Sequence, residues 1–517
     1  MSERFQERNK AYLQSGDSEL LQLKRAEHNV ELRKSKRYEH ARKKRLGLND
    51  EPEPIYDEFY NPNFNAKAIT DQNKPLEDIY STLIAEYPEN LKFEALQLAR
   101  KNLSASKNPD ISRHSQLGLF PVYMSYVNPN LPLPVQAEAT WILVNLTNGE
   151  HRFIESLLKL GIVEACLSLV TYEHLEISEN VFLTIGNIAG DFLGSREDLV
   201  AKGCLDVIIN FLEATLITNP NHSIVKNLVW ALSMLALSSK KYSIEQVERI
   251  ISATRKVIGS QVVEIRLNCL WILFYITSGT AEMLQAVINY GLPQIVANLY
   301  LSNQTKEKYL VIKIIGNILG GDVLQAQAAI DANAIQLIKY AIQDDHQPVR
   351  KEGYWALSNL AAGTKEQIGY IFSYNLHELA LNGLNDRDSS VRLDAVVTFF
   401  NLCVQFTYQE ASILVGLGLV EKFKDIIRND IDPRLLEYVV RACHGLLRAY
   451  NRDSLSCNGM VTIFDSTGLL DQLMKLEMHQ NKNLSSAVKE ILTRFFGVRN
   501  EDENHKIVEP TAHFEFS

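Results

Sequence analysis

A tryptophan, or a residue in its place, followed four residues later by an asparagine recurs along most of this 517-residue chain. Residues i and i+4 of a helix lie on one face, so the two side chains project together. A carboxamide carries donors and acceptors and pairs with the N–H and C=O of an extended peptide. Indole faces attract the stem and charged head of lysine or arginine. The pattern predicts a surface that binds basic peptides.

Seven windows carry the pattern: Trp141–Asn145, Leu183–Asn187, Trp230–Met234, Trp271–Tyr275, Lys313–Asn317, Trp355–Asn359 and Val397–Asn401. Their last residues are 42, 47, 41, 42, 42 and 42 residues apart, within the ~40–47 typical of HEAT and armadillo units. Glycines that stop a helix follow most windows, at Gly149, Gly190, Gly279, Gly320 and Gly363. Because a two- or three-helix unit cannot bury its apolar face alone, the period predicts an all-α, right-handed armadillo-repeat superhelix of about ten repeats with a concave binding surface.

Each residue type in these windows has a plainer interpretation as well. A single tryptophan is more often a core residue, and a single asparagine in an apolar helix caps it or bonds within its repeat. The repetition at one register favours the peptide ladder over these interpretations. Four carboxylates are candidates for selecting positive charge, with solvated surface as the alternative: Glu179, Asp191, Glu352 and Asp394.

Composition excludes several other classes of protein. The chain is 46% apolar and 22% charged, which is typical of a folded protein. No apolar run reaches the ~20 residues of a membrane span, and the polar N-terminus lacks a secretion signal. The six cysteines form no CxxC pair, so we expect core thiols and neither disulfides nor a metal site. No nucleotide, metalloprotease or hydrolase motif occurs, so we expect no cofactor and no enzyme.

Charge divides the chain into a basic segment and an acidic body. Ten Lys or Arg and three Glu between Lys24 and Arg45 give about +7, which leaves roughly −16 for the rest of a chain whose net charge is −9. An acidic body attracts basic peptides rather than nucleic acid. We expect four zones: a basic segment at 1–46, a Pro-bearing acidic linker at 47–75, the armadillo-repeat domain at 76–496 and a polar tail at 497–517.

Several stretches together resemble the importin α family: the ladder, VELRKSKRYEHARKKR (30–45), GNIAGD (186–191), VRKEGYWALSNLAAG (349–363) and TGLLDQLMKLEMHQN (467–481). The resemblance implies a nuclear import adaptor that carries basic localisation-signal cargo, binds importin β, is recycled by an export receptor and shuttles between cytoplasm and nucleus. The importin-β-binding residues would be Arg25, Arg33, Lys34, Lys36, Arg37, Lys43, Lys44 and Arg45. In the family, a cluster such as Lys43 to Arg45 also folds back onto the protein's own peptide site.

The resemblance also assigns the peptide-binding residues, in a major site in the earlier repeats and a minor site in the later ones. The full set is Trp141, Asn145, Gly149, Glu179, Asn187, Asp191, Trp230, Trp271, Tyr275, Lys313, Asn317, Glu352, Trp355, Ser358, Asn359, Asp394 and Asn401. Five positions depart from the family: Leu183 and Val397 replace Trp, Met234 replaces Asn, Ile154 replaces a Thr that helps to bind the key lysine, and Asn268 replaces an acid. The major site loses more polar contacts than the minor site, so an alternative is a scaffold derived from importin α with reduced or altered cargo binding.

A peptide of residues 1–46 is expected to bind importin β with an affinity that falls at least ~10-fold as salt rises from low to physiological concentration. The binding should depend on salt because ten lysine and arginine side chains cluster between Lys24 and Arg45. Changing Arg33, Lys34, Lys36 and Arg37 to Glu should abolish binding in a titration, whereas exchanging the same four between Lys and Arg should preserve it. Equal binding of the Glu variant would refute the assignment.

Overall fold

The computed structural model describes residues 75–105, 109–220, 222–302, 304–405, 407–451 and 459–497, and their regular structure is helical throughout. The predicted basic segment at 1–46 lies outside the described residues, as do nearly all of the linker and of the C-terminal tail. The chain divides into two compact units, the first ending at Leu292 and the second beginning at Pro293.

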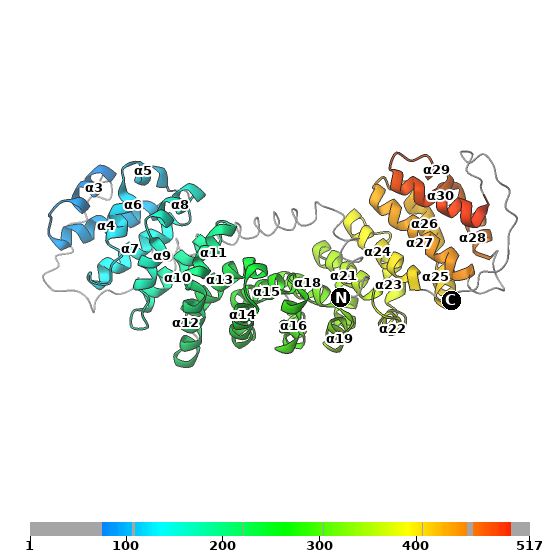
Figure 1. Ribbon diagram of the computed structural model, residues 1–517, viewed down its shortest axis with the longest axis horizontal. Coiled ribbons are helices and arrows are strands. Elements are labelled where there is room, and N and C mark those ends of the chain that lie inside the picture. Colours follow the sequence, from blue (N-terminus) through cyan, green and yellow to red (C-terminus); the bar gives the residue numbers. More distant parts are fainter. Residues whose placement is uncertain are drawn as a thin grey trace. The chain divides into compact units, whose positions relative to one another are not determined.

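The first unit contains short and long helices in alternation (Figure 1). They are α3 (Leu76–Ile84), α4 (Glu89–Ala105), α5 (Ile111–Gln116), α6 (Leu119–Ser125), α7 (Leu133–Leu146), α8 (His151–Lys159), α9 (Ile162–Ser168), α10 (Leu175–Ala189), α11 (Leu193–Ala201), α12 (Cys204–Thr218), α13 (Ile224–Leu235), the 3₁₀ helix η3 (Ala236–Lys241), α14 (Ile244–Val257), α15 (Val263–Thr277) and α16 (Ala281–Asn289).

The second unit continues the alternation. Its helices are α17 (Leu292–Leu299, which starts at the last residue of the first unit), α18 (Thr305–Leu319), α19 (Val323–Asp331), α20 (Ala334–Ala341), α21 (Gln347–Ala361), α22 (Lys365–Ser373), α23 (Leu376–Gly383), α24 (Ser389–Gln405), α25 (Tyr408–Gly416), α26 (Leu419–Asn429), α27 (Pro433–Asn451), α28 (Gly459–Thr467), α29 (Leu469–Leu476) and α30 (Lys482–Phe496).

Within each unit, one helix of each repeat packs against the corresponding helix of the next repeat, and we call these the ladder helices (Figure 1). They are α4, α7, α10, α13 and α15 in the first unit, and α18, α21, α24, α27 and α30 in the second. Every residue of α7 from Val135 to Leu146 is buried, because helices pack around it on all sides. This stacking is the armadillo arrangement, and the ten ladder helices of the described ranges agree with the predicted number of repeats.

A tight turn joins the two shorter helices of most repeats, and its residue has positive φ. Glycine occupies the turn at positions 118, 161, 203, 291, 418 and 468, and asparagine occupies it at 333 and 375. Both residue types tolerate this left-handed conformation. This second marker of the repeat is separate from the glycines that follow the windows.

The irregular spacing of 47 residues between Asn187 and Met234 has a local cause. Helix α12, which lies between these two residues, has 15 residues, whereas its counterpart α9 in the preceding repeat has 7. The extra residues lengthen α12, which is not a ladder helix, so the ladder helices α10 and α13 still pack together.

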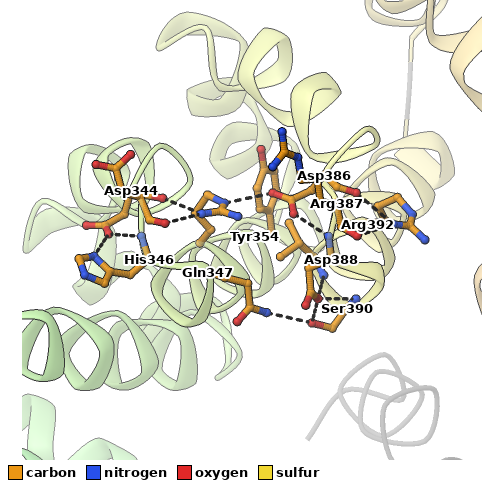
Figure 2. Close-up of polar contacts among 12 residues, drawn as sticks. Asp344, His346, Gln347, Tyr354, Asp386, Arg387, Asp388, Ser390 and Arg392 are labelled. Carbon is orange, nitrogen blue, oxygen red and sulfur yellow. Dashed lines mark hydrogen bonds and ion pairs between the residues drawn. The ribbon is translucent and has the colours of Figure 1, made fainter.

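Polar contacts join neighbouring repeats of the second unit at the loops before the ladder helices (Figure 2). The Arg350 guanidinium donates to the carbonyls of Asp344 and Asp345 in its own loop, at 3.1 and 2.9 Å, and its Nε lies 3.0 Å from the Asp386 carboxylate of the next loop. Arg392, 42 residues later, donates to the Asp386 carbonyl and pairs with Asp430 at 2.7 Å. Each arginine therefore fixes its own loop and ties that loop to the next repeat.

Several predictions from the sequence hold in this fold. The all-α armadillo architecture is confirmed. Gly190 and Gly320 cap α10 and α18 directly, as expected of helix-stopping residues. Five of the six cysteines are buried free thiols, while Cys457 lies outside the described residues. None of the helices in the described ranges is long and apolar enough to cross a bilayer.

Candidate peptide-binding ladder

The seven windows lie in successive ladder helices, towards their C-terminal ends. In the first unit they place Trp141 and Asn145 on α7, Leu183 and Asn187 on α10, Trp230 and Met234 on α13, and Trp271 and Tyr275 on α15. In the second unit they place Lys313 and Asn317 on α18, Trp355, Ser358 and Asn359 on α21, and Val397 and Asn401 on α24. The window residues therefore come together within each unit.

The asparagines of the first unit bond to the preceding ladder helix. Asn145 Nδ2 donates to Ser104 Oγ at 3.1 Å, and Asn187 Nδ2 donates to the Val144 carbonyl at 3.2 Å. The two residues are 1% and 7% exposed. Most of each amide is therefore committed to holding one repeat against another.

Two asparagines of the second unit, Asn359 and Asn401, also bond to the preceding ladder helix but are more accessible. Asn359 Nδ2 donates to the Gly316 carbonyl at 2.9 Å, and Asn401 Nδ2 donates to the Ser358 carbonyl at 2.8 Å. Both side chains are half-buried, and among the described residues no further bond involves their amide oxygens. An amide held in this way presents its oxygen and its second N–H in a fixed orientation for a peptide backbone.

Two tryptophans rest on glycines of the preceding ladder helix. A Cβ on Gly186 would lie 2.2 Å from the Trp230 ring, and one on Gly316 would lie 2.3 Å from the Trp355 ring. Trp230 is only 2% exposed, whereas Trp355 is half-buried. The Trp230 ring is thus a core side chain, and the Trp355 ring keeps an accessible edge.

The face of Trp141 already carries a cation from this chain. The Arg100 guanidinium lies 4.6 Å from the centre of the indole, and its Nε lies 2.5 Å from Glu138 Oε2. Arg100 is on α4, and Glu138 is one helical turn before Trp141 on α7. Burial raises the pKa of Glu138 and the Arg100 guanidinium opposes the shift. Arg100 therefore occupies the position over the Trp141 indole that was predicted for a cargo cation.

Aromatic rings cluster at the fourth window. The Trp271 and Tyr275 rings stack at 5.6 Å, and Phe274 contacts both at 5.7 and 5.5 Å. Trp271 is half-buried, so part of its indole remains on the surface.

The two candidate carboxylates of the first unit both have partners from a neighbouring repeat. Glu179 accepts a hydrogen bond from the Asn227 amide, and Asp191 Oδ2 lies 2.6 Å from His151 Nδ1. Gly149 lies in the turn before α8, where a Cβ would lie 2.7 Å from the Ile111 side chain. Gly149 therefore lies in the α7–α8 connection, and Asp191 of the next repeat contacts His151 at the end of that connection.

Opposite charges alternate across three ladder helices of the second unit. Lys313 Nζ lies 3.3 Å from Glu352 Oε1, and Lys351 Nζ lies 3.7 Å from that oxygen and 3.7 Å from Asp394 Oδ2. The Glu352 and Asp394 side chains are 8% and 9% exposed. Since the two carboxylates are already largely desolvated, a ligand cation that replaced a lysine would meet strong acceptors.

Burial controls the proton affinity of Asp394. Desolvation raises its pKa to about 7, Lys351 opposes the rise and Glu352 adds to it. The Tyr438 phenol on α27 also faces this carboxyl, and its pKa is raised mainly by burial. Asp394 therefore changes its charge in the physiological range.

Reasoning from the sequence missed four residues that complete the site: Arg100, Glu138, His151 and Lys351. Glu138 precedes Trp141 by three residues, the same offset that marks Glu352 before Trp355, so a signal for it was present. Lys351 adjoins Glu352. Arg100 and His151 reach the ladder only through the packing of one repeat on another, and the sequence carries no signal for that.

Comparison with known proteins supports both the fold and the family. Residues 8–97 match the family model described as "Importin beta binding domain". Importin subunit alpha-1a of Oryza sativa subsp. japonica is 28% identical over 370 residues, which cover 71% of this chain and 68% of the relative. Importin subunit alpha-3 of Arabidopsis thaliana is 23% identical over 522 residues, which cover 98% and 96%. The crystal structure of an engineered protein, at 20% identity, superimposes with a TM-score of 0.71 over 81% of this chain and 98% of that one.

Ladder helices that stack repeat on repeat define an armadillo-repeat protein. We call the asparagine that bonds one ladder helix to the preceding one a rung. The match at residues 8–97 and the relatives narrow this further: the chain is similar to proteins named importin subunit alpha over most of its length. The prediction that it is not an enzyme is confirmed by these relatives, which are importin subunits.

Replacing Asp394 with Asn should stabilise the fold more at pH 8 than at pH 5. The carboxyl keeps its proton in the folded chain to about pH 7, whereas an unfolded Asp loses it near pH 4, so its contribution to stability declines as pH rises between these values. We expect the free energy of unfolding of the variant, relative to that of wild type, to rise by at least ~1.4 kcal/mol between about pH 5 and about pH 8 in denaturant titrations.

Asp388→Asn is the matched control with the opposite sign. Hydrogen bonds from Ser390 lower the pKa of Asp388, so that its stabilising effect is present at neutral pH and is lost as pH falls through that lowered pKa. A difference for Asp394→Asn that shrinks as pH rises would mean that pairing with Lys351 outweighs desolvation.

Proposed function

We propose that this chain is a nuclear import adaptor that binds basic localisation-signal peptides along the ladder and links them to importin β through its N-terminal basic segment. The observation that carries the proposal is the charged row of the second unit, formed by Lys313, Glu352, Lys351 and Asp394. Buried carboxylates beside an accessible indole and oriented amides suit an extended peptide with lysine or arginine side chains.

The route of the peptide follows from the geometry of the window residues. Glu352 and Trp355 are three residues apart on α21, so they share one face with Asn359. The peptide backbone would bond to the amides of Asn359 and Asn401. Its cations would lie over Trp355 and exchange with the lysines on Glu352 and Asp394.

The cellular consequences are part of the same proposal. An adaptor that binds cargo and importin β shuttles between cytoplasm and nucleus, and an export receptor would return it. The net negative charge of the body speaks against nucleic acid as a direct ligand.

A second candidate function is an armadillo scaffold with reduced cargo binding, and features of the first unit favour it. Trp230 and Met234 are 2% and 0% exposed, and Leu183 is 9% exposed. Arg100 lies over the face of Trp141. These side chains strengthen the packing of repeats and offer little to a peptide.

Deleting residues 1–46 is expected to tighten binding of a basic peptide at least ~5-fold, because the tethered cluster Lys43–Lys44–Arg45 would otherwise compete at a high effective concentration. The described helices begin at Leu76, so the deletion removes none of them. Fluorescence titration measures the effect. Changing the three basic residues to Ala in the full chain should reproduce it, and equal dissociation constants would show that the cluster does not compete.

Short basic peptides are expected to rely more on the second unit than on the first. In the chain without residues 1–46, Trp355→Ala with Asn359→Ala should weaken binding about 10-fold or more, and Trp141→Ala with Asn145→Ala should weaken it less. The reasons are the accessible edge of Trp355 and the buried amide of Asn145. Isothermal titration gives the ranking.

Thermal unfolding must accompany this comparison, since both asparagines also hold repeats together. Tyr370→Ala with Tyr374→Ala removes an aromatic pair of the second unit that lies off the ladder on and beside α22, and it should leave binding unchanged. The opposite ranking of the two ladder variants would place the dominant site in the first unit.

A further inference from the structure

A histidine of one repeat covers the carboxylate of the next repeat in the first unit. His151 is the first residue of α8, and Asp191 directly follows Gly190, which caps α10. The distance from His151 Nδ1 to Asp191 Oδ2 is 2.6 Å. The Phe192 ring meets the imidazole edge to face at 4.6 Å and 81°. The imidazole is therefore held both by a hydrogen bond and by a ring.

The hydrogen bond fixes the tautomer of this imidazole. A carboxylate only accepts, so Nδ1 carries the hydrogen and donates it to Asp191. The Asp191 side chain is 11% exposed and that of His151 is 52% exposed, so the ring lies on the solvent side of the carboxylate. Among the described residues, His151 is the one side chain that bonds this carboxylate.

Asp191 is also one of the four carboxylates that the sequence offers for selecting positive charge, and it lies one helical turn beyond Asn187. Its surroundings offer little other help to a cargo cation. Ile154, fully buried on α8, has no hydroxyl, and Gly149 has no side chain. A lysine that reaches Asp191 must therefore take the place of the His151 imidazole.

We infer that His151 is a specificity-determining residue of the first-unit site: it competes with the cargo cation for Asp191, weakly when neutral and strongly when protonated. The inference rests on the proposed function. A neutral imidazole donates one ordinary hydrogen bond, which an ammonium group can replace. An imidazolium makes a charge-assisted bond to the same oxygen and repels the incoming cation.

The other charges near His151 are paired among themselves. On the α8 side Glu150 pairs with Arg152 at 3.0 Å, and Glu155 pairs with Lys159 at 2.7 Å. On the α10 side the facing group is Asp191. The charge of the imidazole acts on Asp191, to which it is hydrogen-bonded, and also on Glu155, whose pKa is lowered first by Lys159 and last by His151. Histidine is the side chain that ordinarily changes charge between about pH 5 and 8.

The test is a titration of a fluorescent peptide rich in lysine and arginine, at about pH 6 and about pH 8. It uses the full chain and the chain without residues 1–46, because that segment is proposed to compete for the same site. All proteins in this test, including the one called wild type, also carry Trp355→Ala, Asn359→Ala and Asp394→Asn, which weaken the proposed second-unit site and remove its own pH-sensitive carboxyl. Wild type should bind ~3- to 10-fold more weakly at the lower pH. His151→Ser should bind more tightly than wild type at the lower pH and lose most of the pH dependence, and His151→Lys should bind weakly at both.

The second unit supplies a matched control pair. His346 Nδ1 lies 3.0 Å from Asp344 Oδ1 in the loop before α21 (Figure 2), away from the window residues of that helix. His346→Ser should keep the pH dependence of wild type. Asp191→Asn should bind weakly at both pH values, because it removes the acceptor for which histidine and cargo compete.

The outcomes separate the two proposals. If basic peptides bind no variant, the proposed function is wrong. If wild type and His346→Ser bind and Asp191→Asn is weaker, but His151→Ser keeps the affinity and pH dependence of wild type, the site stands and the competing role of His151 is refuted. Circular dichroism melts of each variant exclude unfolding as the cause of a loss.

Discussion

The contact between one ladder helix and the next is the interaction on which the rest of this molecule depends. A unit of three short helices has too little interior to fold alone, so every repeat is completed by its neighbour. The asparagine rungs are part of that contact, since Asn187 and Asn359 each donate to a carbonyl of the preceding helix. A helical carbonyl has a second lone pair beyond its intrahelical bond, so it accepts the rung without loss. The proposed peptide recognition would thus use residues that the fold already holds in place.

The use of the same residues for stacking and for the proposed binding explains why buried charge is tolerated in the ladder. Burying an ion costs more than its pairing usually returns, so Arg100 with Glu138, or Lys351 with Asp394, adds little to stability. The same pairs lower the cost of binding a cation. A carboxylate that folding has already desolvated, and that a lysine already partners, exchanges one cation for another with little further loss of water. The row in the second unit is therefore better suited to exchange than to stabilisation.

Periodicity predicted the fold from the sequence because stacking imposes one register on every repeat. The spacing of the windows located α7, α10, α13, α15, α18, α21 and α24, and the glycines after them located helix ends. The turn that alternates between glycine and asparagine, as at Gly291 and Asn333, escaped notice because two residue types satisfy one backbone requirement. The placement of Glu352 and Asp394 one turn before the windows of α21 and α24 was predictable, since their offset repeats. The positions of Arg100 and His151 were not, because their partners lie about forty residues away in sequence and only packing brings them together.

The apolar residues at the windows of the first unit differ from an asparagine rung in what they contribute to stacking and in what they leave for a ligand. An asparagine rung contributes one hydrogen bond to stacking and leaves polar groups for a ligand. Met234 contributes apolar burial instead, and with 0% exposure it leaves nothing for a ligand. Trp230, pressed onto Gly186, acts in the same way. Since hydrophobic contact stands where an asparagine would donate a hydrogen bond, these positions still contribute to stacking, and their burial leaves little surface for the proposed peptide. The second unit keeps asparagines at Asn359 and Asn401, whose remaining hydrogen-bonding groups are accessible to water or to the proposed peptide. One half of the ladder is thereby adapted to rigid packing and the other to exchangeable polar contacts, although both are built on the same helix-to-helix contact.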